Sequence, residues 1–437
     1  MLERIRAYFD FDTHGTTFAR EVIAGATTFL SMSYIIVVNP AVLSAAGIPV
    51  GPSMVATILT AIFGTLVMGF YARRPFAIAP YMGENAFIAF TVVQALGYTW
   101  QAALAAVFLA GLLFVLLTVA QVRQWLVEAV PPCLRFSFAV GIGLFLTFIG
   151  LNQTGIIALG VKDAPVQMGH ITSAPVLVSI FGFLVLVALI ILRFRGAILL
   201  GILATTLVAF LAGVSTPPAW WVSRPPSLAP IFWQLDFSAL GSVGFLAVVL
   251  TIFIMAFVDT MGTLIGVSAR AGLLDEQGSL PQIERPMLAD ALATTFAACV
   301  GTATSGAYLE SATGIEAGGR TGLTAVVAGL LFALAIFFSP FVMAIPPQAY
   351  GPALIVVGML MLGPITRINF DDFTELIPAF ATVALMSFTF NIGVGMTAGF
   401  VLYPFCKVIA GRGHEIHSGL WVLFALSLLF YVFYPYH

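Results

Sequence analysis

The sequence predicts an all-α polytopic membrane protein with fourteen transmembrane segments, arranged as a seven-plus-seven inverted repeat. Three observations support this fold class. Of the 437 residues, 60% are hydrophobic and only 8% are charged, whereas soluble domains carry about 25% charged residues. At about 20 residues per membrane-spanning helix, the chain has room for roughly fourteen spans. Short sequence matches also recur in the same order in its two halves.

The composition argues against several classes of function. The net charge is -2 and no basic run occurs, so the chain lacks the positive patch of a nucleic-acid-binding protein. Its three cysteines, Cys133, Cys299 and Cys406, are far apart in apolar segments and lack metal-ligand spacing. No nucleophile motif or phosphate-binding loop is present. We therefore expect no metal, no cofactor and no enzymatic activity, and the charged first twenty residues do not suggest a cleavable targeting segment.

Apolar segments divide the chain into its expected spans, each with boundaries uncertain by a few residues. They lie at about 21–46, 52–72, 84–97, 101–121, 131–151, 174–193, 196–213, 240–268, 288–304, 310–319, 321–345, 351–364, 374–391 and 393–410. A further segment at 418–435 is long enough to cross the membrane or to lie at its interface.

The positive-inside rule orients these spans. With a cytoplasmic N-terminus, only Lys162 and Arg224 of the 17 basic residues fall on the outer side. We therefore predict a multi-pass protein of the plasma or inner membrane.

Two segments are too broken to be plain spans. In 75–86, Pro75, Pro80 and Gly83 interrupt the helix, and in 301–312 Gly, Thr and Ser residues do so. Irregular backbone at membrane depth persists only where it is buried in protein or lines a cavity. A pair of such segments in corresponding halves is typical of a transporter's binding site. We expect half-helices starting at Asn85 and Ser311.

The two halves of the chain align weakly but consistently. IAPYMGENA at 78–86 matches TSGAYLESA at 304–312, which places Glu84 over Glu310 at an offset of 226 residues. Matches at 33–48 and at 130–143 follow with similar offsets. Because the offset contains seven spans, an odd number, the second half enters the membrane from the opposite side. The sequence therefore predicts an inverted repeat.

Five acidic residues fall inside the expected spans, where a charge is costly and indicates function by default. Three of them, Glu84, Asp259 and Glu310, are expected to converge on one central pocket. The other two have structural interpretations: Asp290 lies near Arg285 in a pairing or capping role, and Glu316 precedes Arg320 by four residues, the favourable order for an ion pair. Glu84 has an alternative role as a cap of its own half-helix.

The central pocket is expected to suit a neutral, hydrogen-bonding solute. All five histidines lie in expected loops or tails, so a coupling proton would be carried by a carboxyl group whose pKa burial has raised. No unpaired intramembrane Lys or Arg is available for an anion. Carboxylates can accept from N–H groups, and Asn or backbone amides can donate to carbonyl oxygens and ring nitrogens. Of the aromatic residues on the broken segments, Tyr81 and Tyr308, Tyr308 is the stronger candidate for stacking on a flat ring.

Several motifs resemble those of a known family. GENAFIAFTVV (83–93), FVDTMGTLIGV (257–267) and AYLESATGIEAGGRTGLTAVVAGLLF (307–332) are similar to the motifs of AzgA-type purine permeases, a branch of the nucleobase/ascorbate:cation symporters. The segments at 15–48 and 352–362 resemble the same family, so the similarity covers almost the whole chain.

The resemblance implies a core domain (1–122 with spans 1–4, and 239–345 with spans 8–11) and a gate domain (123–238 with spans 5–7, and 346–437 with spans 12–14 and the last apolar segment). It also implies short antiparallel strands near 76–79 and 304–307, ahead of the half-helices. A homodimer through the gate domain is implied as well.

The resemblance further implies import of adenine, guanine or hypoxanthine by proton symport with alternating access. The implied base-binding residues are Asn85, Asp259 and Glu310, with Tyr308 stacking and with backbone amides near Glu84 and Ser311 completing the site. The full set of candidate substrate-binding residues is Asp259, Glu310, Asn85, Glu84, Tyr308, Ser311 and Thr313. Proton coupling is assigned to Asp259, Glu84 and Glu310.

The chain departs from the family pattern at two positions. Ala256 stands where many members carry an acid, and Glu84 stands where an apolar residue is usual. We hypothesise that Glu84 replaces the missing carboxyl group. Two alternatives for the cargo remain: the same fold carrying uracil, xanthine or another small heterocycle, and a sulfate-type anion transporter.

Overall fold

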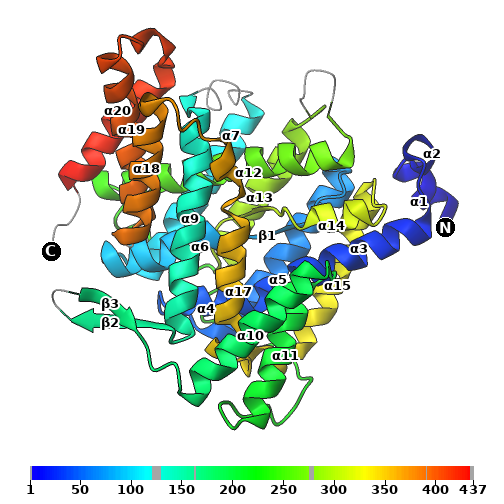
Figure 1. Ribbon diagram of the computed structural model, residues 1–437. Coiled ribbons are helices and arrows are strands. Elements are labelled where there is room, and N and C mark those ends of the chain that lie inside the picture. The colour runs from blue at the N-terminus through cyan, green and yellow to red at the C-terminus, as the bar shows by residue number, and fades with distance from the viewer. Residues whose placement is uncertain (1, 121–128, 162–163, 275–279, 390, 434–437) are drawn as a thin grey trace.

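The computed structural model describes residues 2–120, 129–161, 164–274, 280–389 and 391–433, and it is mostly helical (Figure 1). The longer helices are α3 (Phe18–Met32), α4 (Ile35–Ser44), α5 (Val50–Val67), α7 (Trp100–Val119), α9 (Pro132–Gln153), α10 (Ala174–Ile191), α11 (Ala197–Leu211), α12 (Val243–Ala271), α13 (Glu284–Val300), α15 (Gly322–Ala335), α17 (Pro347–Leu360), α18 (Phe373–Phe388), α19 (Ile392–Ile409) and α20 (Ser418–Phe433). The shorter elements are α1 (Leu2–Tyr8), α2 (Phe11–His14), η1 (Met68–Ala72), α6 (Met82–Ala86), η2 (Phe87–Ala95), α14 (Ser311–Glu316), η3 (Ile336–Phe338), α16 (Ser339–Met343), η4 (Gly363–Arg367), η5 (Gly413–Glu415) and the strands β1 (Ile78–Pro80), β2 (Ile157–Val161), β3 (Ala164–Met168) and β4 (Ser305–Ala307).

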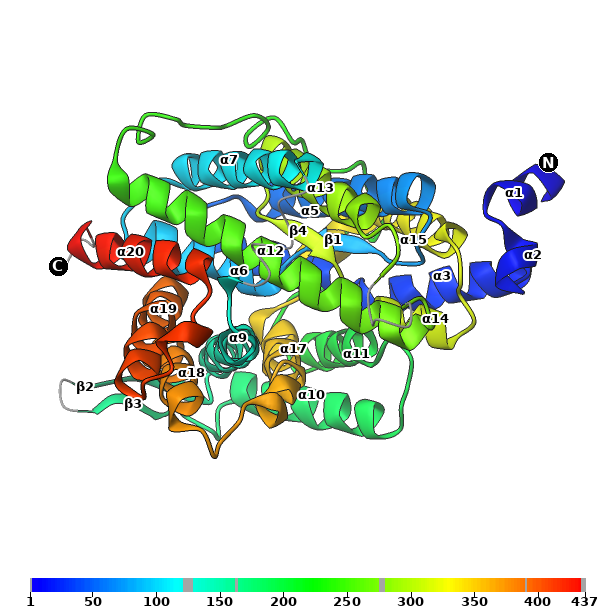
Figure 2. The same ribbon diagram turned by 90° about the horizontal axis from the view of Figure 1, so that it is seen from above.

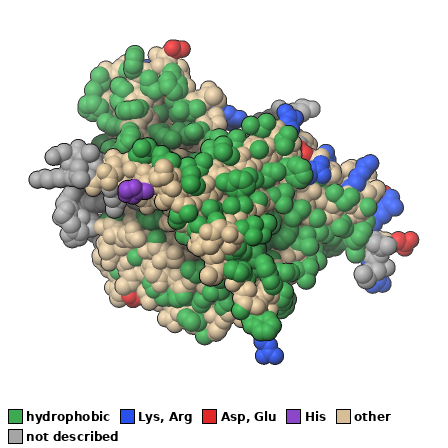
Figure 3. Space-filling view, turned by 60° about the horizontal axis from the view of Figure 1, so that its bottom comes forward, with side chains coloured by type: hydrophobic (Ala, Val, Ile, Leu, Met, Phe, Trp, Pro, Cys, Tyr) green, Lys and Arg blue, Asp and Glu red, His purple; other side chains and the backbone are tan. Residues whose placement is uncertain are grey.

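The helices have the character of a multi-pass membrane protein. Within the described residues, nine helical segments are long and apolar enough to cross a membrane, and α11, α18 and α20 are shorter apolar helices. The face drawn in Figure 3 is largely hydrophobic, with charged side chains few and near its edges. Two of the basic residues used to orient the chain, Arg123 and Lys162, lie outside the described residues. The topology relative to the two sides of the membrane stays a prediction.

The predicted pair of antiparallel strands is confirmed. β1 and β4 are hydrogen-bonded with Ile78 opposite Ala307 and Pro80 opposite Ser305. Each strand is also held by a threonine of a neighbouring helix: the Thr65 hydroxyl of α5 bonds both backbone groups of Ile78, and the Thr294 hydroxyl of α13 does the same for Ser305. The two halves of the chain therefore meet at a two-fold-related crossing, as an inverted repeat requires.

The structural register of the repeat differs by one residue from the sequence alignment. The Tyr81 amide donates to the Thr304 carbonyl, and the Tyr308 amide donates to the Ala77 carbonyl. These equivalent bonds relate position 81 to position 308, an offset of 227. Glu84 is therefore the counterpart of Ser311, and not of Glu310 as expected. The sequence alignment pairs the two glutamates because chemical likeness is the only guide where no backbone pairing is visible.

The helices pack in two groups (Figure 2). The first contains α3, α4, α5, α7, α12, α13, α14 and α15 and surrounds β1 and β4; the second contains α9, α10, α11, α17, α18 and α19. In the second group, α9 and α17 approach closely at glycines, since a Cβ on Gly143 would lie 2.6 Å from the Gly358 carbonyl oxygen. Small residues at such crossings let membrane helices pack backbone to backbone. A hairpin of β2 and β3, not foreseen from the sequence, follows α9.

Glu21 of α3 fastens this helix to the start of α15. Its carboxyl group is fully buried and accepts from the backbone amides of Arg320, Thr321 and Thr324 at 3.0–3.3 Å, and from the hydroxyls of Thr16, Thr321 and Thr324 at 2.6–2.9 Å. The amides of Arg320 and Thr321 precede α15, and that of Thr324 lies in its first turn, where N–H groups lack the usual partner four residues earlier in the helix. The contact between Glu21 and Thr321 joins residues 300 positions apart.

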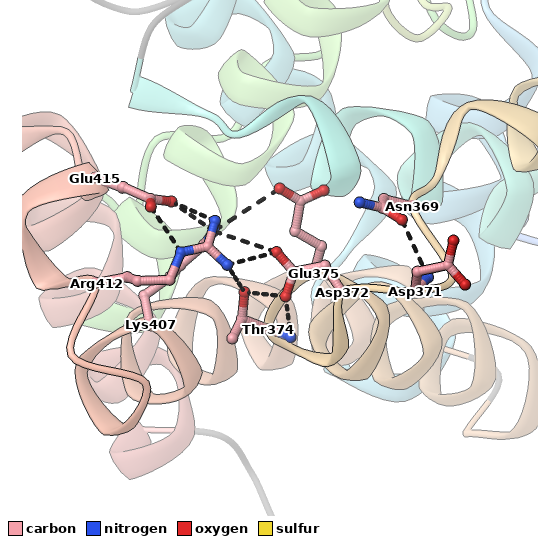
Figure 4. A network of polar contacts seen from close by, with 8 residues as sticks. All are labelled: Asn369, Asp371, Asp372, Thr374, Glu375, Lys407, Arg412 and Glu415. Atoms are coloured by element: carbon pink, nitrogen blue, oxygen red, sulfur yellow. Dashed lines mark hydrogen bonds and ion pairs between the residues drawn. The ribbon is translucent and has the colours of Figure 1, made fainter.

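A charged network holds α18, α19 and η5 together (Figure 4). The Lys407 ammonium group, 1% exposed, lies 2.8 Å from the Glu415 carboxylate, 3.8 Å from that of Glu375 and 4.0 Å from that of Asp372. Arg412 pairs at 2.6 Å with both Asp372 and Glu415. The hydrogen bonds from Arg412 and Lys407 lower the pKa of Glu415 from its usual 4.5 to about 2. Hydrogen bonds from the Thr374 hydroxyl and from Arg412 likewise lower the pKa of Asp372.

Candidate functional site

The first broken segment turns from strand to helix earlier than expected. Tyr81 keeps extended backbone angles and is the N-cap of α6, which begins at Met82 and continues as the π-helix η2. The expected start at Asn85 is therefore wrong, and Glu84 lies in the first turn of α6. Pro80 ends the strand, but nothing after it prevents helical backbone, so Gly83 is simply a first-turn residue. π-Helical turns occur frequently at functional sites.

Two tyrosines related by the repeat flank the strand crossing. The rings of Tyr81 and Tyr308 are nearly parallel, at 9°, with centroids 6.3 Å apart. Each hydroxyl is tied down, since that of Tyr308 donates to the Pro80 carbonyl and that of Tyr81 lies 3.4 Å from the Thr260 hydroxyl. The structure thus holds both rings in fixed, parallel orientations.

Glu84 is the most exceptional acid of the region. Its side chain is 1% exposed, and neither carboxyl oxygen accepts a well-aligned hydrogen bond from the described residues, although the Thr304 hydroxyl lies near enough to interact with it. It interacts electrostatically with Asp259 of α12, which brings the third and eighth expected spans together. A buried polar group without a partner costs about 1–3 kcal/mol. Such a group in a native fold calls for a ligand, a proton or water as its partner.

The other two predicted acids are less buried. Asp259 and Glu310 are both partly exposed. Glu310 precedes α14 and accepts a 2.6 Å hydrogen bond from the hydroxyl of Tyr34, a buried residue between α3 and α4. Sequence reasoning misses Tyr34, although its hydroxyl in an apolar span is a visible signal.

Asp290 occupies a different position from the one expected. It is fully buried in α13 and accepts a hydrogen bond from the Thr260 hydroxyl. Within the described residues it forms no ion pair with Arg285. Because Thr260 also contacts the Tyr81 hydroxyl, Asp290 belongs to the support of the tyrosine pair.

The remaining predicted residues are engaged with the protein itself. The Ser311 hydroxyl accepts from the Ala77 amide at 3.0 Å, and the Thr313 hydroxyl lies 2.9 Å from that of Ser31 and 2.7 Å from the Glu310 carbonyl. Asn85 donates its amide N–H to the side-chain oxygen of Asn39. In the part of the chain that the structure describes, no group of three or more His, Cys, Asp or Glu side chains could hold a metal ion. The arrangement is chemically a set of hydrogen-bond acceptors beside two parallel aromatic rings.

Comparison with known proteins identifies the chain's family. The Xan_ur_permease model, which describes a permease family, matches residues 19–402. The chain belongs to this permease family. The guanine/hypoxanthine permease PbuG of Bacillus subtilis is 41% identical to this permease over 440 residues, covering 98% of this chain and 100% of PbuG. The adenine permease AdeP of Escherichia coli is 40% identical over 437 residues, covering 100% of this chain and 97% of AdeP.

Solved structures confirm the architecture of this permease. The transmembrane domain of the cyanobacterial bicarbonate transporter BicA superposes with a TM-score of 0.65 at 14% identity, covering 87% of this chain and 96% of that domain. The structure of SLC26A9 gives a TM-score of 0.66 at 11% identity, covering 90% of this chain and 65% of that one. At these identities the likeness concerns the seven-plus-seven fold alone.

Proposed function

We propose that this permease is a secondary transporter that imports a purine nucleobase together with a proton. The observation that supports the proposal is the pair of parallel rings of Tyr81 and Tyr308, beside which Glu84 interacts electrostatically with Asp259, and Tyr308 with both Glu310 and Glu84. Flat heterocycles with N–H edges fit parallel aromatic faces and carboxyl acceptors. The relatives PbuG, a guanine/hypoxanthine permease, and AdeP, an adenine permease, support the same cargo.

In this proposal Asp259, Glu310 and Asn85 bind the base, Tyr308 stacks on it, and a carboxyl group among Asp259, Glu84 and Glu310 carries the proton. Glu84 is the strongest candidate for the proton because burial without a partner favours the neutral form of a carboxyl group. Ala256 precedes Asp259 by three residues on α12 and therefore shares its face. Glu84, which interacts with Asp259, can thus replace the acid missing at position 256.

Transport requires the site to face each side in turn. We assign the first helix group, which carries the site, to a core domain and the second group to a gate domain, and we propose alternating access by movement of one against the other. Ser311 and Thr313 then act by bracing β1 and α3. A homodimer through the gate domain and a cytoplasmic N-terminus remain part of the proposal.

The test is uptake of radiolabelled hypoxanthine, guanine and adenine into proteoliposomes, with and without an imposed pH gradient. We expect uptake that the gradient drives and that Asp259→Asn and Glu310→Gln abolish. The matched control is Glu3→Gln, on exposed α1. Flux of an inorganic anion that none of the three bases inhibits would overturn the proposal.

A further inference from the structure

Four polar side chains form a closed cluster beside the proposed site. Asn39 of α4, Thr57 of α5, Asn85 of α6 and Thr302, between α13 and β4, are each 0% exposed. The Asn39 amide nitrogen donates to the Thr57 oxygen at 2.7 Å and to the Thr302 oxygen at 3.0 Å. The Asn39 oxygen accepts from the Asn85 amide nitrogen.

The direction of every bond in this cluster follows from one backbone group. A hydroxyl has a single proton, and that of Thr57 is given to the Ser53 carbonyl at 2.7 Å. Toward Asn39, the Thr57 oxygen can then only accept. Asn39 must therefore turn its nitrogen to Thr57 and its oxygen to Asn85. Asn85 must in turn present its nitrogen to Asn39.

These hydrogen bonds leave the side-chain oxygen of Asn85 without a partner inside the cluster. It is buried and has no partner among the described residues, and the two carboxyl oxygens of the preceding residue, Glu84, share this condition. Two consecutive residues of α6 thus offer three acceptor oxygens when Glu84 is ionised, and two when it is protonated, while one N–H of Asn85 is bound to Asn39. Leaving a buried acceptor unmet costs about 1–3 kcal/mol. Because the cluster prevents the side-chain amide of Asn85 from rotating by 180°, the nitrogen cannot take the place of the unpaired oxygen, and this free-energy cost remains.

We infer that Asn39 and Thr57 are positioning residues that fix Asn85 as a hydrogen-bond acceptor, so that the site selects a base with adjacent N–H donors on one edge. The inference rests on the proposed function. Guanine has such an edge, formed by its ring N1–H and its 2-amino group. Hypoxanthine lacks the amino group, and in adenine the 6-amino group is flanked by a ring nitrogen that is itself an acceptor. Guanine should therefore bind best.

The experiment measures binding of guanine and hypoxanthine to the purified full chain, because these bases differ only in the 2-amino group. We expect the wild type to prefer guanine by about tenfold, the equivalent of one hydrogen bond of about 1.4 kcal/mol. Thr57→Val removes the acceptor that orients Asn39 and should reduce this preference at least threefold. Thr57→Ser keeps the hydroxyl and should retain it. A general loss of packing would weaken both bases alike and leave their ratio unchanged.

The possible results separate this inference from the proposed function. If neither base binds the wild type, the proposed function fails, and the inference with it. If the wild type binds hypoxanthine as tightly as guanine, or if Thr57→Val keeps the ratio of Thr57→Ser, the inference alone is wrong. The wild-type comparison decides the matter even where Thr57→Val does not fold. Asn39→Asp, which can still accept from Asn85, should keep the preference for guanine.

Discussion

Removing the carboxyl group of Glu21 should destabilise the protein far more than removing an exposed carboxyl group. Glu21→Ala removes an acceptor from three amide N–H groups at the start of α15. The Thr324 amide keeps the Thr321 carbonyl as an acceptor at 3.2 Å, whereas the amides of Arg320 and Thr321 are left without one. Each unmet buried donor costs about 1–3 kcal/mol. Two such donors cost about 2–6 kcal/mol, and partial repair by water and by the threonine hydroxyls reduces this sum, so we expect a loss of about 2–4 kcal/mol.

Glu21→Gln is the informative intermediate. It preserves the shape of the side chain and one acceptor oxygen, which can serve Thr321 and Thr324, but its amino group then faces the Arg320 amide. Hydrogen bonds to a charged acceptor contribute about 1.5–3 kcal/mol, against about 0.5–1.5 kcal/mol for a neutral one. We expect a loss of about 1–2 kcal/mol for this variant.

The assay is reversible denaturation in mixed micelles, which yields the free energy of unfolding. Glu3→Ala, at an exposed position of α1, is the control and should change stability by less than about 0.5 kcal/mol. The reasoning would be refuted if Glu21→Ala were no more destabilising than Glu3→Ala.

Three further predictions concern the tyrosine pair, the charged network and the buried glutamate. A Cβ at position 306 would lie 2.3 Å from the Tyr81 ring, so Gly306→Ala should displace that ring. We expect the KM for base uptake to rise roughly tenfold and stability to fall by about 1–3 kcal/mol. The control is Gly241→Ala, in the turn before α12, where a Cβ meets open space, and it should change neither quantity. Because the pKa of Glu415 is lower in the folded state, its contribution to stability is present above pH 4.5 and is lost as the pH falls toward about 2. As the pH is lowered through this window, the unfolding temperature of Glu415→Gln should therefore fall less steeply than that of the wild type. Equal dependence of the unfolding temperature on pH in the two proteins would contradict a stabilising role for the network. Glu84→Gln should remove the pH dependence of uptake, and the replacement hypothesis is wrong if uptake and its pH dependence are unchanged.

Local chemistry makes much of the fold predictable. The runs of apolar residues locate the spans, and Pro75, Pro80 and the glycines mark the two breaks at which β1 and β4 are found. Such features depend on residues close together in the chain. α6 begins at Met82 and not at the predicted Asn85, because Gly83 does not break the helix. The extended backbone ends at Tyr81, and the helix starts at the next residue.

The parts of the site that could not be predicted depend on contacts distant in the chain. Glu21 meets residues some 300 positions away, and no periodicity joins them. Asn39 lies in an otherwise apolar span, SYIIVVNP, and its function becomes visible only when Thr57 and Asn85 are placed beside it. Proximity in sequence suggests Arg285 as the partner of Asp290, but the helix turns this acid toward Thr260.

The two-fold relation between β1 and β4 bears on how an asymmetric cargo is held in one orientation. Two matching halves place like side chains, Tyr81 and Tyr308, on the two sides of the strand crossing, and a site built from these alone would accept a ligand equally well after a half-turn. The residues around the crossing differ, however: at the offset of 227, Gly83 corresponds to Glu310 and Glu84 to Ser311. A purine has no two-fold axis, so these mismatched positions are where the orientation of the proposed cargo is decided. The sequence differences between the two halves therefore remove the two-fold equivalence that the fold alone would impose on a bound ligand.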